Sequence, residues 1–182
     1  LFRSHELQTE RDVTAMFVAT EGDEFGDRMK AQRIRTDAFL KSMNEKISSV
    51  DATQVSPRFA KMLSELPKDR NAVVAHREKI DSLKIKVAEA IDYYNAAIKS
   101  DLAVVKSMIR GMKNGEAIRR ITPYLAAVEA KEFASQERSS VIAVILDMNF
   151  DIKQTQHFIS LIAKQNTEFE IFQDAAVPEV QK

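Results

Sequence analysis

The sequence predicts an all-α protein, an elongated antiparallel helical bundle built as two four-helix bundles that share their long helices. The chain has 182 residues but only four Gly and four Pro, fewer than the turns of a sheet protein would use. Apolar residues recur at spacings of three and four along most of the sequence. The breaks between these runs leave helices of roughly 20 to 45 residues, or roughly 30 to 65 Å at 1.5 Å per residue.

The first half of the chain is divided by three breaks. Gly and acidic residues at 21–26 predict a turn between two helices of about 20 residues each, and the second of these ends near 48–49. Residues 51–56 are expected to form a loop. A Ser-Pro pair at 56–57 begins the next helix, with Ser as its cap and Pro in its first turn. That helix is short, because Pro67 kinks or restarts it.

The second half begins with the clearest helical periodicity, which predicts a single long helix over 68–113. Its apolar positions are Ile80, Leu83, Val87, Ile91, Tyr94, Ile98, Leu102, Val105, Ile109 and Met112. An Asn-Gly pair at 114–115 ends this helix, and a Thr-Pro pair at 122–123 restarts the helical run. A turn at 147–150 then precedes a last helix over 151–173.

Composition excludes several classes of function. Lys plus Arg and Asp plus Glu each number 27, so the chain has no net charge to attract nucleic acid, and we expect no nucleic-acid partner. The chain has no Cys and only three His, so we expect no metal, no cofactor and no enzyme activity. No apolar stretch approaches the roughly 18 to 20 residues of a membrane span. We interpret the opening at Leu1, without an N-cap, as a domain cut from a longer protein.

Two Glu-Arg pairs carry the main functional signal, because Arg11 and Arg138 each lie on an apolar stripe of their helix while the adjoining glutamates point elsewhere. The residues four before and four after are Leu7 and Ala15 for Arg11, and Ala134 and Ile142 for Arg138. A guanidinium keeps its charge, so on an inward face it needs a carboxylate, carbonyls or a bound anion. Two converging arginines would bind a small planar monoanion. The alternative is that each is a rim residue whose head reaches water.

Three further positions are weaker candidates. Arg33 is expected to pair with Asp37 four residues on, and is also a candidate ligand contact. Tyr93 donates its hydroxyl either to a ligand or to a carboxylate on a neighbouring helix. His76 is expected to be partly buried and hydrogen-bonded, or else to act as a pH switch. Arg77 is expected on a solvated helix edge.

Several short motifs follow one another along the chain: Glu10-Arg11, Gln32-Arg33 with Thr36-Asp37, Tyr93-Tyr94, and Lys131-Glu132-Phe133 followed by Gln136-Glu137-Arg138. Their order resembles the NIT domain, the nitrate- and nitrite-sensing module of bacterial receptors, over roughly residues 6 to 173. The resemblance implies an all-helical sensor domain with nitrate or nitrite as ligand and with Arg11 and Arg138 in the binding site. The family usually has Gly after each Glu-Arg, where this chain has Asp12 and Ser139.

We therefore predict a sensor domain over residues 1–173 and a tail over 174–182 that leads toward a membrane or output segment. Such domains occur outside the membrane in chemoreceptors, histidine kinases and cyclases, and in the cytoplasm in transcription antiterminators. We expect the periplasmic domain of an inner-membrane receptor, most often a chemoreceptor, which forms a homodimer and is linked to the membrane through spans outside this chain. One alternative is a helical scaffold or adaptor without a small ligand. The other is a cytoplasmic regulatory domain that controls antitermination.

Overall fold

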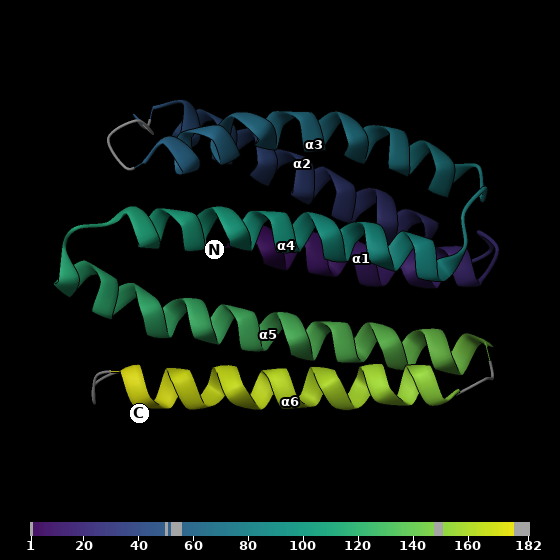
Figure 1. The fold of residues 1–182 in the computed structure, drawn as a ribbon. Helices are drawn as coiled ribbons and strands as arrows, with labels where there is room; N and C mark the ends of the chain where they lie inside the picture. The colour runs from purple at the N-terminus through teal and green to yellow at the C-terminus, as the bar shows by residue number, and fades with distance from the viewer. Residues whose placement is uncertain (1, 50, 52–55, 148–150, 177–182) are drawn as a thin grey trace. The chain divides into compact units, whose positions relative to one another are not determined.

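The computed structural model describes residues 2–49, 51, 56–147 and 151–176, which form six α-helices and no strand (Figure 1). The prediction of an all-α helical fold is confirmed. The helices are α1 Phe2–Ala19, α2 Gly26–Ser48, α3 Pro57–Asp81, α4 Val87–Gly111, α5 Gly115–Asp147 and α6 Ile152–Ala175.

The chain divides into two compact units, Leu1–Gly111 and Met112–Lys182. In the first unit, α1 packs against α2 and α4, and α3 packs against α4. In the second unit, α5 and α6 form an antiparallel hairpin and lie side by side along their lengths (Figure 1). Each of the six described helices lies entirely within one unit. The predicted sharing of long helices between two bundles is therefore not found among the described residues.

Local capping signals set several helix ends where the sequence predicts them. The hydroxyl of Ser56 accepts a hydrogen bond from the Phe59 amide at 3.1 Å and caps α3. The turn between α1 and α2 lies at the predicted Gly-rich segment 21–26. The predicted loop at 51–56 and turn at 147–150 fall largely outside the described residues, as does the tail from 177 onward.

The predicted single helix over 68–113 is wrong, because the chain turns between Asp81 and Val87. At this turn the Leu83 backbone has a φ of 53°, in the left-handed region, and its amide donates to the Ile80 carbonyl at 2.9 Å. Ile80, Leu83 and Val87 keep a helical spacing across the turn, so periodicity alone did not reveal it. The side chain of Leu83 lies against the α1–α2 turn at Gly22, which accounts for an apolar residue at this position.

The predicted restart at Thr122-Pro123 is also wrong, since α5 runs without interruption from Gly115 and contains Pro123. Asn114 provides the start instead, because its side-chain oxygen accepts from the amides of Glu116 and Ala117 at 3.0 and 3.2 Å. The Thr122 hydroxyl donates to the Ile118 carbonyl at 2.8 Å within the helix, whereas the donor that Pro123 lacks would have served the Arg119 carbonyl. α3 likewise continues through Pro67.

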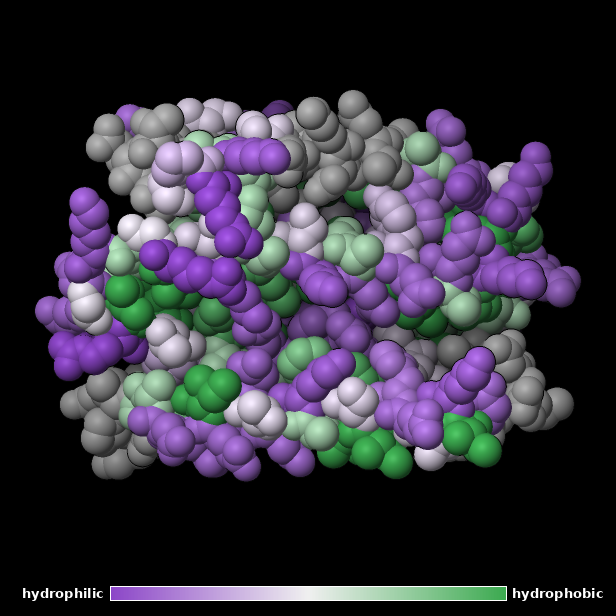
Figure 2. All heavy atoms as spheres, in the orientation of Figure 1, coloured by the Kyte–Doolittle hydropathy of each residue, from purple (hydrophilic) through white to green (hydrophobic). Residues whose placement is uncertain are grey.

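Helix α1 is buried around its whole circumference between Glu10 and Ala15, although four of these six residues are polar. A helix covered on every side is usually apolar throughout. The second unit shows the opposite pattern, with exposed large apolar side chains such as Ile145 and Ile152 at 67% and 77% exposure. Figure 2 shows apolar side chains breaking the hydrophilic surface over α6. Among the described residues, no helix is long and apolar enough to cross a membrane.

Candidate functional site

Arg11 is a fully buried cation in the middle of α1, with 0% of its surface exposed. Its Nη1 donates a hydrogen bond to the side-chain oxygen of Asn95 on α4, and its Nε lies 3.7 Å from an Asp12 carboxylate oxygen. Arg11 therefore occupies an inward face, as the sequence predicts. A guanidinium cannot lose its proton to escape burial, so the protein keeps a positive charge inside the first unit.

Glu10 is also fully buried, which corrects the expectation that it points away from the arginine face. It accepts two hydrogen bonds from Arg77, to Oε1 at 2.8 Å and to Oε2 at 2.9 Å. The Tyr94 hydroxyl donates to the same Oε1 at 2.8 Å. Adjacent residues of a helix point about 100° apart. Both are buried because α1 is covered on more than one side, by α2 and by α4.

Arg77 connects three helices rather than lying on a solvated edge. Beyond its two bonds to Glu10, its Nη1 donates to Asp37 of α2 at 2.7 Å. Burial lowers the pKa of Arg77, but the hydrogen bonds and charges of Glu10 and Asp37 outweigh it, and the net shift is upward. Burial and the Glu10 charge likewise raise the pKa of the Tyr94 hydroxyl. Both groups keep their protons, so this cluster is a fixed ion-paired centre.

The predicted Arg33 to Asp37 pair is wrong. Arg33 donates instead to both carboxylate oxygens of Asp81, at 2.7 and 3.0 Å, and its Nε lies 4.0 Å from Glu10. Asp37 pairs with Arg77. Both partners, Asp81 for Arg33 and Arg77 for Asp37, lie on helix α3. A rule that considers only residues i and i+4 of one helix cannot predict them.

Two further polar residues of α2, Gln32 and Thr36, join it to the start of α1. Gln32 is 1% exposed and its amide nitrogen donates to a Glu6 carboxylate oxygen at 2.7 Å and to the Glu6 carbonyl at 3.1 Å. Thr36 is fully buried, and its hydroxyl donates to the Gln32 carbonyl at 3.2 Å. The Gln-Arg and Thr-Asp motif of α2 therefore serves the packing of three helices in the first unit.

Tyr93 stacks on His76, with the two ring centroids 3.7 Å apart and the planes 17° from parallel. Tyr94 meets both rings edge-on, at 5.8 Å from His76 and 5.7 Å from Tyr93. His76 is 7% exposed, and burial followed by the charge of Lys79 lowers its pKa. Tyr93 thus has a structural contact of its own, whether or not its hydroxyl reaches a ligand.

Arg138 is exposed, and its Nη2 donates to the Ser135 hydroxyl at 3.1 Å. The prediction that its apolar stripe faces inward is wrong, since Ile145 and Val141 on that stripe are 67% and 42% exposed. The buried face of α5 instead carries mainly small residues, together with Glu132: Ala126, Ala130, Ser135 and Ser139. Arg11 belongs to the first unit and Arg138 to the second.

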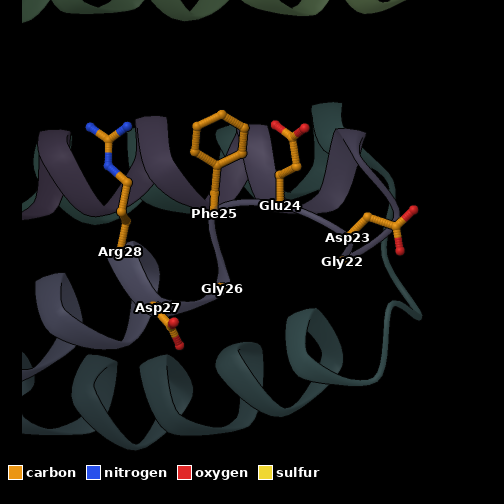
Figure 3. A pocket seen from close by; sticks show the side chains of 7 residues that line it. All are labelled: Gly22, Asp23, Glu24, Phe25, Gly26, Asp27 and Arg28. Carbon is orange, nitrogen blue, oxygen red and sulfur yellow. The ribbon is translucent and has the colours of Figure 1, made fainter.

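A depression of about 470 Å³ lies at the α1–α2 turn, away from every predicted site residue. Its lining consists of Gly22, Asp23, Glu24, Phe25, Gly26, Asp27 and Arg28. Figure 3 shows Arg28, Phe25 and Glu24 pointing to one side, with the Arg28 guanidinium carbon 5.7 Å from the Phe25 ring centroid. Three carboxylates against one guanidinium make this surface unfavourable for an anion.

Comparison with known proteins places this geometry in a family. The family model described as NIT, nitrate and nitrite sensing, matches residues 4–182. No curated protein matches the chain. The structure of the NasR transcription antiterminator is similar, with a TM-score of 0.91 and 20% sequence identity over 97% of this chain and 48% of that one. That likeness shows the fold, and this chain spans about half the length of that protein. Since the family model covers nearly all residues of this chain, the chain belongs to the NIT family.

Proposed function

We propose that this chain is a sensor domain that binds nitrate or nitrite and signals by shifting the relative positions of its helices. One observation carries the proposal: Arg11 is a fully buried cation, and the acceptor that α4 offers it is the neutral amide of Asn95. A buried ion pair contributes little to stability compared with apolar packing, so a charged α1 interior points to function. The family description supports the choice of ligand.

The chemistry of the guanidinium suits a small planar monoanion. Its fork presents parallel N–H donors to two oxygens at once, and each charged hydrogen bond contributes about 1.5 to 3 kcal/mol. After the entropy cost of association, two or three such bonds predict micromolar affinity. Arg11 is the residue that we assign to the ligand, whereas a ligand contact of Arg138, which is exposed in the second unit, stays a prediction. Ligand contacts of Arg33 and Tyr93 stay predictions, since each has a structural partner, Asp81 and His76.

A bound anion would transmit a signal through differential affinity. If the ligand holds α1 more tightly in one position than in another, a preference of about 1 to 3 kcal/mol is enough to shift the balance between two arrangements. No covalent chemistry is needed for this.

We propose as its context the periplasmic part of an inner-membrane receptor such as a chemoreceptor, acting as a homodimer. A second candidate is a regulatory domain for transcription antitermination, which the likeness to the NasR antiterminator favours. The full-length sequence distinguishes them: apolar spans on both sides of this domain support the receptor, and an RNA-binding segment after residue 182 supports the regulator.

Calorimetry and thermal unfolding with sodium nitrate and sodium nitrite test the ligand, with sodium chloride at equal ionic strength as the control. We expect a heat of binding and a rise in melting temperature that chloride does not give. Arg11→Lys keeps the charge but removes the fork, so it should weaken binding at least tenfold. Arg138→Ala tests the ligand contact predicted for Arg138 from the sequence. Arg120→Ala is the matched control, because Arg120 is 77% exposed and pairs only locally with Glu116. A wild-type protein that responds to nitrate and nitrite no more than to chloride would rule out the proposal.

A further inference from the structure

We propose that Asn95 is a positioning residue that sets the anion affinity of Arg11, because it orients the guanidinium without adding negative charge. This inference rests on the proposed binding of nitrate or nitrite at Arg11. The contact itself joins α1 to α4 inside the first unit, where the Asn95 side-chain oxygen accepts from Arg11 Nη1. Asn95 is half-buried and Arg11 is fully buried, so the contact is shielded from bulk water.

Consecutive residues of α1 meet consecutive residues of α4, and the two pairs differ in charge. Glu10 accepts from Tyr94, and its own charge is met by the bidentate Arg77. Arg11 donates to Asn95, which is an amide. A carboxylate at this position would give α4 a formal ion pair with Arg11, as α3 gives Glu10 through Arg77. The acidic member of the Glu-Arg pair thus meets a cation, whereas the contact that position 95 of α4 makes with the basic member adds no charge.

This difference matters for a ligand that carries a single negative charge. Such an anion competes with every protein carboxylate near the guanidinium, and Asp12 already lies 3.7 Å from Arg11 Nε. A second carboxylate within hydrogen-bond distance would cancel the remaining attraction. An amide of the same shape holds the side chain in place and leaves the field of the cation intact. Substitutions at position 95 can therefore distinguish the effect of the orientation of the Arg11 side chain from the effect of negative charge placed near it.

Two substitutions distinguish these properties. Asn95→Asp keeps the shape and an acceptor oxygen but adds a charge, whereas Asn95→Ala removes the acceptor. We expect Asn95→Asp to weaken nitrate binding more than tenfold, while the nitrate-free protein melts at the wild-type temperature or a few degrees above it, because a charged hydrogen bond replaces a neutral one. Asn95→Ala should weaken binding severalfold and lower the melting temperature. Asn166→Asp, on the exposed part of α6, is the matched control and should bind nitrate as the wild type does.

The measurements are calorimetry with sodium nitrate and thermal unfolding without it. A residue that only joins α1 to α4 would change affinity and melting temperature in the same direction, so opposite or uncoupled changes in Asn95→Asp support the proposal. It is overturned if Asn95→Asp binds nitrate within twofold of the wild type, or if its affinity and melting temperature fall together as in Asn95→Ala. In both of these outcomes wild-type binding remains, whereas a wild type that does not bind nitrate contradicts the proposed function itself.

Discussion

Glu10 and Asp37 allow a test of how strongly burial changes the energetics of an ion pair, because both accept from the same arginine at nearly the same distance. Arg77 donates to Glu10 at 2.8 and 2.9 Å and to Asp37 at 2.7 Å. The Glu10 side chain is 0% exposed, whereas that of Asp37 is 57% exposed. If distance decided the energy, Glu10→Ala and Asp37→Ala would cost similar amounts. If burial decides it, they differ severalfold.

The expected magnitudes follow from what each substitution leaves behind. Glu10→Ala removes the buried carboxylate that meets the half-buried Arg77 guanidinium and the hydroxyl of Tyr94, so it should lower the free energy of unfolding by about 3 to 5 kcal/mol. Asp37→Ala removes a partner that water can replace, and should cost less than about 1 kcal/mol. At roughly 2 to 4 °C per kcal/mol for a chain of this size, the melting temperature should fall by roughly 6 to 20 °C in the first case and by at most roughly 4 °C in the second.

Urea denaturation followed by far-ultraviolet circular dichroism at neutral pH measures both changes. The double variant Glu10→Ala with Arg77→Leu provides a check, since removing both charges should restore much of the stability that Glu10→Ala loses. Equal costs for Glu10→Ala and Asp37→Ala would refute the reasoning, as would a double variant less stable than Glu10→Ala alone. The first result would mean that Glu10 is accessible to water in solution, and the second that Arg77 is held by other groups.

Three further predictions concern the turn, the stacked rings and the anion site. Gly22→Ala should lower the free energy of unfolding by about 1 to 2 kcal/mol in urea denaturation, because Gly22 has a φ of 86° and a Cβ there would lie 3.3 Å from Leu83 Cδ1. Gly115→Ala should leave the free energy of unfolding unchanged, since a Cβ at Gly115 meets no atom within 4 Å. Burial lowers the pKa of His76 below 6.5, so the stability that neutral His76 contributes is present above pH 6.5 and is lost as the pH falls below 6.5. Thermal unfolding between about pH 7.5 and 5.5 should show this loss of stability, and the loss should be smaller in His76→Gln. Asp12→Asn should raise nitrate affinity about fivefold by calorimetry, because it removes the carboxylate 3.7 Å from Arg11, and unchanged affinity would contradict a ligand at that guanidinium.

The helix ends that could be predicted are those marked by local chemistry. The turn at 21–26 and the Ser-Pro start at 56–57 each use residues whose backbone or side-chain preferences act within a few positions. The sequence does not reveal the turn after Asp81, because apolar residues keep a helical spacing through it. It does not reveal the helix across Pro123 either, because α5 packs along α6 and continues although the proline has no N–H to donate to the Arg119 carbonyl. Propensity is local, whereas these outcomes are decided by tertiary contacts.

The candidate site was predicted in part for the same reason. Burial of Arg11 follows from the apolar residues around it on its own helix. The partners of the charged residues cannot be inferred from their own helices, because Arg33 pairs with a residue 48 positions away and Arg77 pairs with residues 40 and 67 positions away. Asn95 carries no signal in the sequence, because an amide on a helix is most often a surface residue. The face of Arg138 was mistaken because α5 buries its small residues, which a search for large apolar side chains overlooks.

The polar interior of α1 also limits how that helix can move. A slide of one residue along its axis is about 1.5 Å, which would stretch a 2.8 Å hydrogen bond beyond the range in which it holds. The flexible Arg77 side chain has enough rotatable bonds to follow such a slide, but the rigid phenol of Tyr94 does not. The hydrogen bond from Tyr94 to Glu10 therefore opposes an axial slide of α1 against α4, because breaking it would leave a buried hydroxyl and a buried carboxylate oxygen with one partner fewer.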